Sequence, residues 1–478
     1  MRPTTALTLA ASLLSVVEAL QLVKREGAPR VLQTEIQRRD DIQDVVKRDL
    51  ARRNRRVKRS TTLQATLDNE ETLYYANASL GTPGQAVRLH IDTGSSDLWV
   101  NSASSSYCTA KESPCKSAGT YSANDSSTYE FVNSKFNISY VDGSGAAGDY
   151  VKDTFTFAGT DLTGLQFGVG YSSTSSQGVL GIGYVINEAA VNRAGLDSYP
   201  NLPQLLVNQG IIQSNAYSLW LNDLDASTGN ILFGGVDSEK YHGTLSTLPI
   251  LKEFGLYQEF TIALTGVGYN GNHGSFFSTN NSDSAVSVLL DSGSSLAYLP
   301  DSVVSDIYEK TGAQYDSSEG VAFIDCDKSY SSETIDFTFS SPTISVSMSE
   351  LVITAGYSNN QPICILGIAP AGDSSCVLGD TFLRSAYVVY DLANNEISLA
   401  QTNFNATSSN ILEITTGTAA VPDATGVANA VSTLAGGTGG ARNGGVDVKG
   451  GAAGAQITAM PKAALAAAAG AGLLFALQ

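Results

Sequence analysis

The stretch VRLHIDTGSSDLWVN occupies residues 87–101, and a similar stretch, VSVLLDSGSSLAYL, occupies residues 286–299. In each, an apolar run leads into an aspartate, a small hydroxyl residue, a glycine and two serines. This pattern is typical of a strand that ends in a carboxylate. One such tripeptide alone would also fit an ordinary β-turn, because Asp and Gly both favour turns.

A second pair of landmarks decides between these interpretations. After Asp92 the chain reaches a Val-Leu-Gly sequence that ends at Gly181, and after Asp291 it reaches another that ends at Gly379. The aspartate and the glycine are 89 residues apart in the first half and 88 residues apart in the second. Matched landmarks at matched spacing indicate a duplicated unit. The repeat therefore predicts two similar lobes, each of which supplies one aspartate.

These two boxes, each followed by an apolar-apolar-glycine sequence, resemble the pepsin-like aspartic proteases of eukaryotes. The resemblance extends from about residue 73 to residue 400. Within the family, the Gly-Gly-Val-Asp sequence at 234–237 with Tyr241 and the LGDTFLR sequence at 378–384 are most similar to the fungal yapsin and candidapepsin branch. The resemblance implies an all-β, bilobal fold with pseudo-two-fold symmetry and a cleft between the lobes.

The resemblance also implies the chemistry. In this family two aspartates share one proton, so that one is a base and the other an acid, and this is a known family property rather than a deduction from spacing. Asp92 and Asp291 are expected to activate a water for attack on a peptide carbonyl, without a covalent acyl-enzyme. Their neighbours are expected to support them, Thr93 and Ser292 by bonds across the lobes, Ser95 and Ser294 by bonds to the outer carboxylate oxygens, and Gly94 and Gly293 by leaving room.

A substrate-covering hairpin, the flap of the family, is expected in the sequence ISYVDGSG at residues 138–145. Tyr140 matches the flap tyrosine of the family, and Trp99 matches the tryptophan that meets it. Val141 stands where the family commonly has glycine, and a β-branched residue stiffens the backbone. Asp142, followed by Gly143 in the same flap, could present a carboxylate to a basic substrate side chain, which predicts cleavage beside Lys or Arg.

Charge is distributed unevenly along the 478 residues, whose formal net charge is −18. Residues 21–59 contain thirteen Lys or Arg and six Asp or Glu, a net of +7; Arg2 and Glu18 cancel in the preceding residues, which leaves −25 for residues 60–478. So acidic a body is not expected to bind nucleic acid. We expect a monomer whose partners are protein or peptide substrates, and which works at acidic pH.

Composition also divides the chain into segments. We expect a signal peptide at 1–19 and a basic propeptide at 20–59, cut after Lys58-Arg59 by a kexin-like convertase or by the enzyme itself. Two β lobes follow at 60–250 and 251–404, with short helices near 202–207 and 302–310, the second capped by Asp301 or Ser302. A flexible Thr/Ala/Gly-rich stalk is expected at 405–450. Residues 451–478 match a GPI-attachment signal, with attachment at Gly450 or alternatively Asn443, and with an Ala-rich soluble tail as the other interpretation.

Five cysteines in a secreted chain indicate disulfides and one remaining thiol. Cys108 and Cys115 lie close enough to close a small loop, Cys326 and Cys364 could close a larger one, and Cys376 lies in an apolar run typical of a buried thiol. No C-x-x-C pair occurs and the chain has three histidines, so we expect neither a metal nor another cofactor. The five N-x-[ST] sequons expected to accept glycans when exposed are at Asn77, Asn124, Asn137, Asn280 and Asn405.

Other functions fit less well. None of the histidines lies in an H-E-x-x-H sequence, no G-x-S-x-G sequence occurs, and the single S-x-x-K, at residues 113–116, lies in a Ser-rich loop. A pepsin-like binding protein without catalysis and a GPI-anchored structural glycoprotein of the cell surface remain as alternatives. Because both aspartates and their hydroxyl neighbours are present, the sequence predicts a secreted aspartic endopeptidase held at the cell membrane or cell wall.

Overall fold

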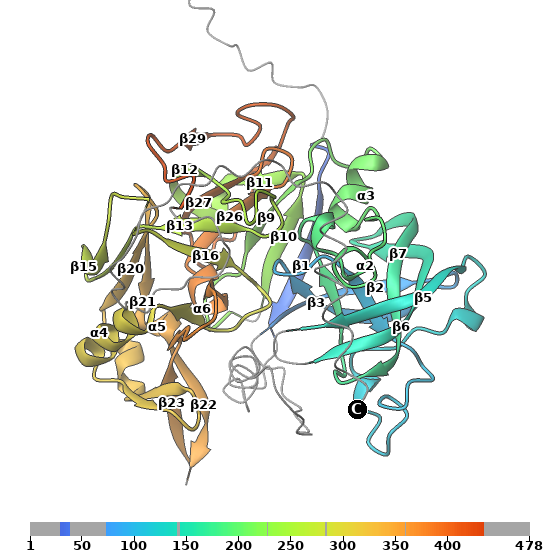
Figure 1. Cartoon of the computed structure of the whole chain (residues 1–478), viewed down its shortest axis with the longest axis horizontal. Helices are drawn as coiled ribbons and strands as arrows, with labels where there is room; N and C mark the ends of the chain where they lie inside the picture. The colour runs from blue at the N-terminus through green and yellow to red at the C-terminus, as the bar shows by residue number, and fades with distance from the viewer. Residues whose placement is uncertain are drawn as a thin grey trace, which may run out of the picture. The chain divides into compact units, whose positions relative to one another are not determined.

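The computed structural model describes residues 29–38, 73–140, 144–226, 228–282, 284–358 and 360–434 (Figure 1). Within these ranges strands greatly outnumber helices, which confirms the all-β prediction. The strands of the first half are β1 (Leu32–Arg38), β2 (Tyr74–Leu80), β3 (Gln85–Asp92), β4 (Leu98–Asn101), β5 (Glu130–Ser139), β6 (Gly145–Phe157), β7 (Thr160–Ser173), β8 (Gly178–Gly181), β9 (Ala216–Trp220), β10 (Thr228–Phe233), β11 (Gly235–Asp237) and β12 (Tyr241–Pro249).

The second half contributes further strands and smaller sheets. Its strands are β13 (Thr261–Leu264), β14 (Gly266–Tyr269), β15 (Asn272–Ser278), β16 (Val286–Leu290), β17 (Ala297–Leu299), β18 (Gln314–Asp316), β19 (Val321–Ile324), β20 (Thr334–Thr338), β21 (Thr343–Ser347), β22 (Val352–Ser358), β23 (Gln361–Leu366), β24 (Ile368–Pro370), β25 (Cys376–Leu378), β26 (Ala386–Asp391), β27 (Glu396–Thr402), β28 (Ile411–Glu413) and β29 (Ala424–Gly426).

The strands of the two halves pair in the same order and with the same orientations, as a duplicated unit predicts. In the first half, β3 pairs parallel with β8, β8 antiparallel with β4, and β4 parallel with β7. In the second half, β16 pairs parallel with β25, β25 antiparallel with β17, and β17 parallel with β24. Asp92 lies opposite Gly181 in this register, and the last pair of β16 and β25 precedes Asp291 and Gly379 by one residue.

Gly181 and Gly379, which end the two Val-Leu-Gly sequences, have no room for a side chain. A Cβ atom on Gly181 would lie 2.6 Å from the amide nitrogen of Ser96, and one on Gly379 would lie 2.3 Å from the carbonyl oxygen of Ser294. Backbone atoms at such distances cannot move aside cheaply, so a side chain at either position would displace the turn that follows each aspartate. The repeated glycine thus allows each aspartate box to rest on its neighbouring strand.

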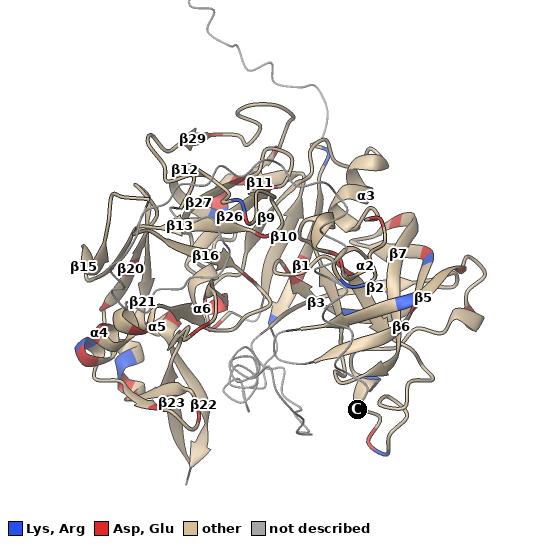
Figure 2. Cartoon of the chain, viewed as in Figure 1, with Lys and Arg blue, Asp and Glu red and all other residues tan. Residues whose placement is uncertain are grey.

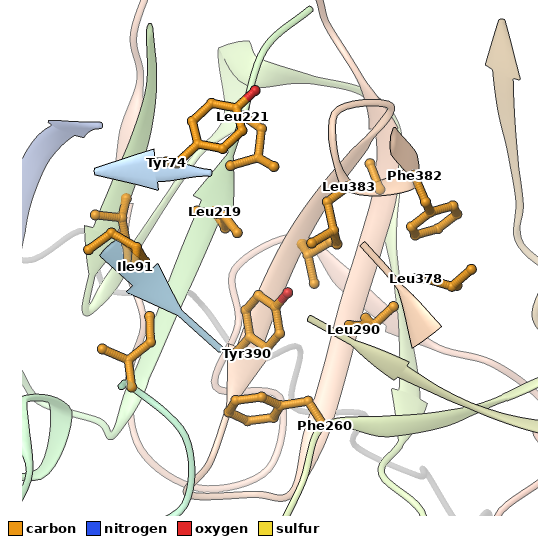
Figure 3. Close-up of a cluster of buried hydrophobic side chains, with 14 of the residues drawn as sticks. Tyr74, Ile91, Leu219, Leu221, Phe260, Leu290, Leu378, Phe382, Leu383 and Tyr390 are labelled. Atoms are coloured by element: carbon orange, nitrogen blue, oxygen red, sulfur yellow. The ribbon is translucent and has the colours of Figure 1, made fainter. Parts of the chain in front are cut away.

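The halves share a central sheet and a core. Strands β10 and β9 of the first half continue into β26 and β27 of the second half, and β12 returns to pair with β27. The predicted boundary near residue 250 therefore falls at the end of β12, but the lobes remain joined by hydrogen bonds at this sheet. Buried side chains from both halves form one core cluster, with Ile91 and Leu219 of the first half and Leu290 and Tyr390 of the second among them (Figure 3). The stacked rings of Tyr217 and Tyr390, one from each half, lie 5.0 Å apart.

Strand β1 comes from the segment predicted as a propeptide. It pairs antiparallel with β10 along six residues and with β2 at its end, and Ile36 is fully buried. This part of the basic segment therefore lies within the central sheet, between β10 and β2, because its apolar residues fit a buried ladder position. Lys58 and Arg59 lie outside the described residues, as does the predicted signal peptide.

The prediction of a flexible stalk from residue 405 was wrong for residues 405–434. Strand β28 pairs antiparallel with β11, and β29 pairs parallel with β12. Ile414, fully buried, packs in a cluster with Ala420 and Val421 against the central sheet. The stretch is poor in apolar residues overall, yet those few enter one cluster, which offsets the ordering cost. Asn443 and Gly450, the two predicted GPI sites, lie outside the described residues.

Both predicted helices are present, at α3 (Leu202–Asn208) and α4 (Asp301–Thr311). The predicted cap of α4 was wrong: the N-cap is Pro300, and the Asp301 carboxylate instead accepts a bond from the Gly372 amide. No helix in the described ranges is long and apolar enough to span a membrane. The other helices are the α-helices α2 (Ala189–Asn192), α5 (Met348–Leu351) and α6 (Asp380–Leu383) and the 3-10 helices η1 (Pro114–Lys116), η2 (Ala123–Asp125), η3 (Val185–Asn187), η4 (Ser238–Lys240) and η5 (Cys326–Tyr330).

Candidate functional site

The two aspartate boxes fold in the same way. Asp92 ends β3, and Asp291 follows β16 directly. The amide of Gly94 donates to Oδ1 of Asp92 at 2.9 Å, and the amide of Gly293 donates to Oδ1 of Asp291 at 2.7 Å. In each box the side chain of the aspartate thus accepts a bond at its inner oxygen, Oδ1, from the backbone amide two residues later, which is the usual hydrogen bond of an aspartate in a turn.

The outer oxygens are bound by serines. Ser95 Oγ donates to Oδ2 of Asp92 at 2.5 Å, and Ser294 Oγ donates to Oδ2 of Asp291 at 2.7 Å. Hydrogen bonds donated to the charged form of a carboxylate favour that form. Both aspartates are thereby held in a fixed orientation by two donors each.

Thr93 and Ser292 interlock the boxes across the two halves. Thr93 Oγ1 donates to the carbonyl of Leu290 and accepts from the amide of Ser292, both at 2.9 Å. In return, Ser292 Oγ donates to the carbonyl of Ile91 at 2.9 Å and accepts from the amide of Thr93 at 3.1 Å. Both side chains are buried, so these bonds are exchanged away from water and fix the relative position of the two carboxylates.

The glycines of the boxes show how close the two carboxylates lie. A Cβ atom on Gly94 would lie 2.5 Å from Oδ1 of Asp291. A Cβ atom on Gly293 would lie 2.4 Å from Oδ1 of Asp92 and 2.9 Å from Oδ1 of Asp291, so these two oxygens are at most 5.3 Å apart. Two carboxylates at such a separation cannot both ionise cheaply, and the arrangement can hold one proton and one water between them.

The predicted flap tyrosine and tryptophan are brought together. Trp99 Nε1 donates to the hydroxyl of Tyr140 at 2.7 Å, and the amide of Tyr140 donates to the carbonyl of Ser144 at 2.8 Å, where the hairpin of β5 and β6 closes. Burial, together with the negative charge of Asp92, raises the pKa of Tyr140, so its hydroxyl stays protonated. Val141, Asp142 and Gly143, between these anchors, lie outside the described residues.

Two buried acids behind the flap were not predicted from the sequence. Asp97 accepts bonds from the hydroxyls of Tyr150 at 2.9 Å and Tyr199 at 2.8 Å, and from the amide of Ala189 at 2.7 Å. The carboxyl group of Glu188, at the start of α2 and fully buried, accepts a bond at Oε2 from the amide of Tyr199 at 2.9 Å, and its Oε1 has no hydrogen-bond partner among the described residues. Burial, with a smaller contribution from Asp97, raises the pKa of Glu188 to about 9. The pair lies at the start of α2, because Glu188 is the N-cap of this helix and Asp97 accepts from the amide of its first residue, Ala189.

Disulfides join Cys108 to Cys115 and Cys326 to Cys364, with Cα atoms 5.1 Å and 5.3 Å apart, which confirms the predicted pairs. Cys376 is buried and belongs to neither. The asparagines of the five sequons are all exposed. In the part of the chain that the structure describes, no three His, Cys, Asp or Glu side chains are placed to hold a metal ion.

Comparison with known proteins assigns a family to this arrangement. Residues 73–402 match the profile described as eukaryotic aspartyl protease. The chain is 54% identical over 432 residues to "Probable aspartic-type endopeptidase opsB" of Aspergillus oryzae, covering 89% of this chain and 87% of that protein. It is 35% identical to "Aspartic proteinase 3" of Saccharomyces cerevisiae, covering 77% of this chain and 76% of that protein. The crystal structure of an aspartic proteinase from Irpex lacteus has a similar fold, with a TM-score of 0.57 at 21% identity over 71% of this chain and 96% of that one.

Proposed function

Because the chain belongs to the eukaryotic aspartyl protease family and is an aspartic-type endopeptidase, we propose that Asp92 and Asp291 together hydrolyse peptide bonds with a water held between them. The observation that carries this proposal is the interlock of Thr93 and Ser292, which holds the inner carboxylate oxygens at most 5.3 Å apart. Acid-dependent cleavage of a peptide that a statine-type inhibitor blocks would test it directly.

The proposed mechanism has two stages, each with two proton transfers, and the second stage breaks the carbon–nitrogen bond. The ionised aspartate takes a proton from the water, the water oxygen bonds to the scissile carbonyl carbon, and the protonated aspartate gives its proton to the carbonyl oxygen. The tetrahedral intermediate then collapses: one of its hydroxyls returns a proton to an aspartate, the amine nitrogen takes a proton from the other, and the carbon–nitrogen bond breaks. Water has been added across the peptide bond, and the pair is left with one proton.

We propose a preference for basic residues beside the scissile bond. In the sequence Asp142 stands between Tyr140 and Ser144, which bond to each other through their backbones, and a carboxylate on a substrate-covering flap would lie near a bound substrate. Acidic positions are also distributed over the strands of both halves (Figure 2), and few basic groups would compete for them. A Lys or Arg side chain of the substrate would gain a charge-assisted hydrogen bond there.

Replacing Asp142 by asparagine is expected to lower kcat/KM for peptides with Lys or Arg beside the cleavage site by roughly three- to tenfold, since one charge pair is lost. Peptides with neutral residues at that position should be cleaved at the original rate. The measurement is cleavage of a peptide library at pH 4–6, with Asp149→Asn on the same hairpin as the matched control. An apolar preference in the unaltered enzyme would end this part of the proposal.

We further propose that the enzyme is secreted, glycosylated and held at the cell membrane or wall by a GPI anchor. The apolar residues 6–17 near the start and the small-residue and apolar tail at 451–478 support this, and so do the five exposed sequon asparagines.

Phosphatidylinositol-specific phospholipase C is expected to release the processed enzyme from intact cells in active form. A chain ended after residue 434 keeps β28 and β29 and should be found in the medium without phospholipase. Full-length activity found mainly in the medium, or a membrane fraction that phospholipase does not release, would contradict anchoring by GPI.

A further inference from the structure

Arg193 bonds the first strand of the flap at its root. It is the C-cap of α2, and its guanidinium donates from Nη2 to the carbonyl oxygen of Ser139 at 2.8 Å. Ser139 is the last residue of β5 and directly precedes Tyr140. A bond from a cation to a carbonyl is charge-assisted and stronger than a bond between neutral groups. The backbone next to Tyr140 is thus tied to a helix outside the flap hairpin.

The pairing of the flap strands leaves this carbonyl open to Arg193. Ser139 lies opposite Gly145 of β6, but the amide and the carbonyl of Gly145 bond to Oγ1 and to the amide of Thr174, both at 3.0 Å. Directly opposite residues of an antiparallel ladder exchange either both bonds or neither, so the carbonyl of Ser139 faces away from β6. Strand β5 is the edge of its sheet, where such a carbonyl meets no further strand. Arg193 supplies the donor that a strand would otherwise give.

Arg193 is itself held against the turn of Asp92. The amide of Ala189, the first residue of α2, donates to Oδ2 of Asp97 at 2.7 Å, and Asp97 follows Asp92 by five residues. The amide of Arg193 donates to the carbonyl of Ala189 at 3.0 Å. Ala189 and Ile138 of β5 also belong to one buried cluster. A series of contacts therefore runs from the first aspartate box, through α2 and Arg193, to the root of the flap.

Tyr140 has two further bonds, one from its backbone and one to its side chain. Its amide donates to the carbonyl of Ser144 at 2.8 Å, and its hydroxyl accepts from Nε1 of Trp99 at 2.7 Å. Burial, with a smaller contribution from the negative charge of Asp92, raises the pKa of this hydroxyl, so the hydroxyl lies close enough to Asp92 to sense its charge. The bond from Arg193 fixes the backbone that precedes Tyr140. The position of the ring relative to Asp92 therefore depends on Arg193.

We propose that Arg193 is a positioning residue for peptide hydrolysis, which holds Tyr140 beside Asp92 through the carbonyl of Ser139. This inference rests on the proposed mechanism and extends it to a side chain that need not contact the substrate. Without the guanidinium, the carbonyl of Ser139 would bond to water, and Tyr140 would be held less closely to the place where it meets a substrate. Looser positioning of a group that contacts the substrate lowers kcat/KM.

The test is a double-variant cycle, which measures whether two residues act together. Arg193→Met removes the donor and keeps an unbranched side chain, and Tyr140→Ala removes the ring that Arg193 is proposed to position. The measurement is kcat/KM for one peptide at acidic pH, with the naturally processed enzyme, for each variant and for both changes together. Arg193→Lys keeps a charged donor, and Lys135→Met on β5 is the matched control for the loss of one exposed positive charge.

We expect Arg193→Met to lower kcat/KM by about fivefold, the usual effect of losing one hydrogen bond. In the Tyr140→Ala background the same change should lower it by less than about twofold, because the side chain that Arg193 positions is gone. Arg193→Lys and Lys135→Met should each stay within about twofold of the unaltered enzyme. Because the side chain of Arg193 is exposed, these variants should fold.

Equal losses from Arg193→Met in both backgrounds would overturn the proposal, since Arg193 would then act independently of Tyr140. No loss in the unaltered background would overturn it too, as would a loss in Arg193→Lys as large as that in Arg193→Met. If Tyr140→Ala has too little activity to measure, the dissociation constant of a statine-type inhibitor replaces kcat/KM in the same cycle, with the same expected ratios.

The outcome is separable from the mechanism itself. An unaltered enzyme without acid protease activity would refute the proposed mechanism. An active enzyme in which Arg193→Met has no effect, or the same effect with and without the ring of Tyr140, would refute only the role of Arg193.

Discussion

Asp92→Asn is expected to reduce kcat by about 10⁴-fold or more at every pH between 3 and 7, because an amide can neither give nor take the protons that the aspartate pair exchanges with the substrate. The fold should survive the change. The amide oxygen still accepts from Gly94, and the Ser95 hydroxyl can rotate to accept from the new NH₂ group. Activity should therefore fall without a comparable loss of thermal stability.

The measurement pairs cleavage of a fluorogenic peptide with thermal unfolding. Asp161→Asn is the matched control, because that carboxylate is exposed and bonds only a neighbouring threonine among the contacts described, Thr156. It should leave kcat within about twofold of the original value, as surface changes usually do. An Asp92→Asn enzyme that keeps more than a tenth of the activity would show that another group performs the hydrolysis.

Local chemistry explains why the aspartate boxes could be predicted from the sequence. An aspartate, a hydroxyl residue and a glycine at the end of a strand form much the same turn wherever they occur, and the repeat of Asp92 at Asp291 predicts that the two turns form one site. The disulfides were predictable because Cys108 and Cys115 are only seven residues apart and Cys376 lies in an apolar run, which leaves Cys326 and Cys364 as the second pair. The short helices α3 and α4 were predictable from composition and from Pro300.

Features that depend on distant partners could not be predicted. Strand β1 and the cluster around Ile414 are set by ladder positions on β10 and β11, which composition does not reveal. His90 lies inside the quoted box, but its bond to Ser292 joins residues 202 positions apart. Glu188 looks like a surface residue in the sequence, and its burial follows from the packing of Tyr199 and the flap strands around it.

Glu188 makes the free energy of unfolding of the enzyme decrease as pH rises toward neutral. In the unfolded chain its pKa is 4.5, and in the folded chain it is raised to about 9. Below pH 4.5 both states hold the proton, and Glu188 contributes no pH dependence. Between pH 4.5 and 9 the folded state holds a proton that the unfolded state releases, so the free energy of unfolding falls as pH rises. At about 1.4 kcal/mol per pH unit, the loss by pH 7 is about 3 kcal/mol.

Glu188→Gln should remove this slope, because glutamine stays neutral while its oxygen can still accept from the Tyr199 amide. We expect the variant to match the original enzyme near pH 4, or to be less stable by about 1 kcal/mol where the new NH₂ group lacks a partner. At pH 7 it should be more stable by about 2 kcal/mol. Thermal unfolding from pH 3.5 to 7.5 measures the stability difference near pH 4 and the difference at pH 7. Glu130→Gln, on the exposed start of β5, controls for the loss of one negative charge.

A residual slope in Glu188→Gln is expected and is informative. Burial also raises the pKa of Asp97 and of Asp391, so each of these carboxyls adds its own loss of stability as pH rises. The variant should therefore flatten the decline without abolishing it, and Asp97→Asn in addition should flatten it further. Because Asp97 and Glu188 lie close together, the two changes need not add, and their double variant measures the coupling. Parallel curves for Glu188→Gln and the original enzyme would show that Glu188 is ionised in the folded state at neutral pH, and the acid preference would then have to come from the aspartate pair alone.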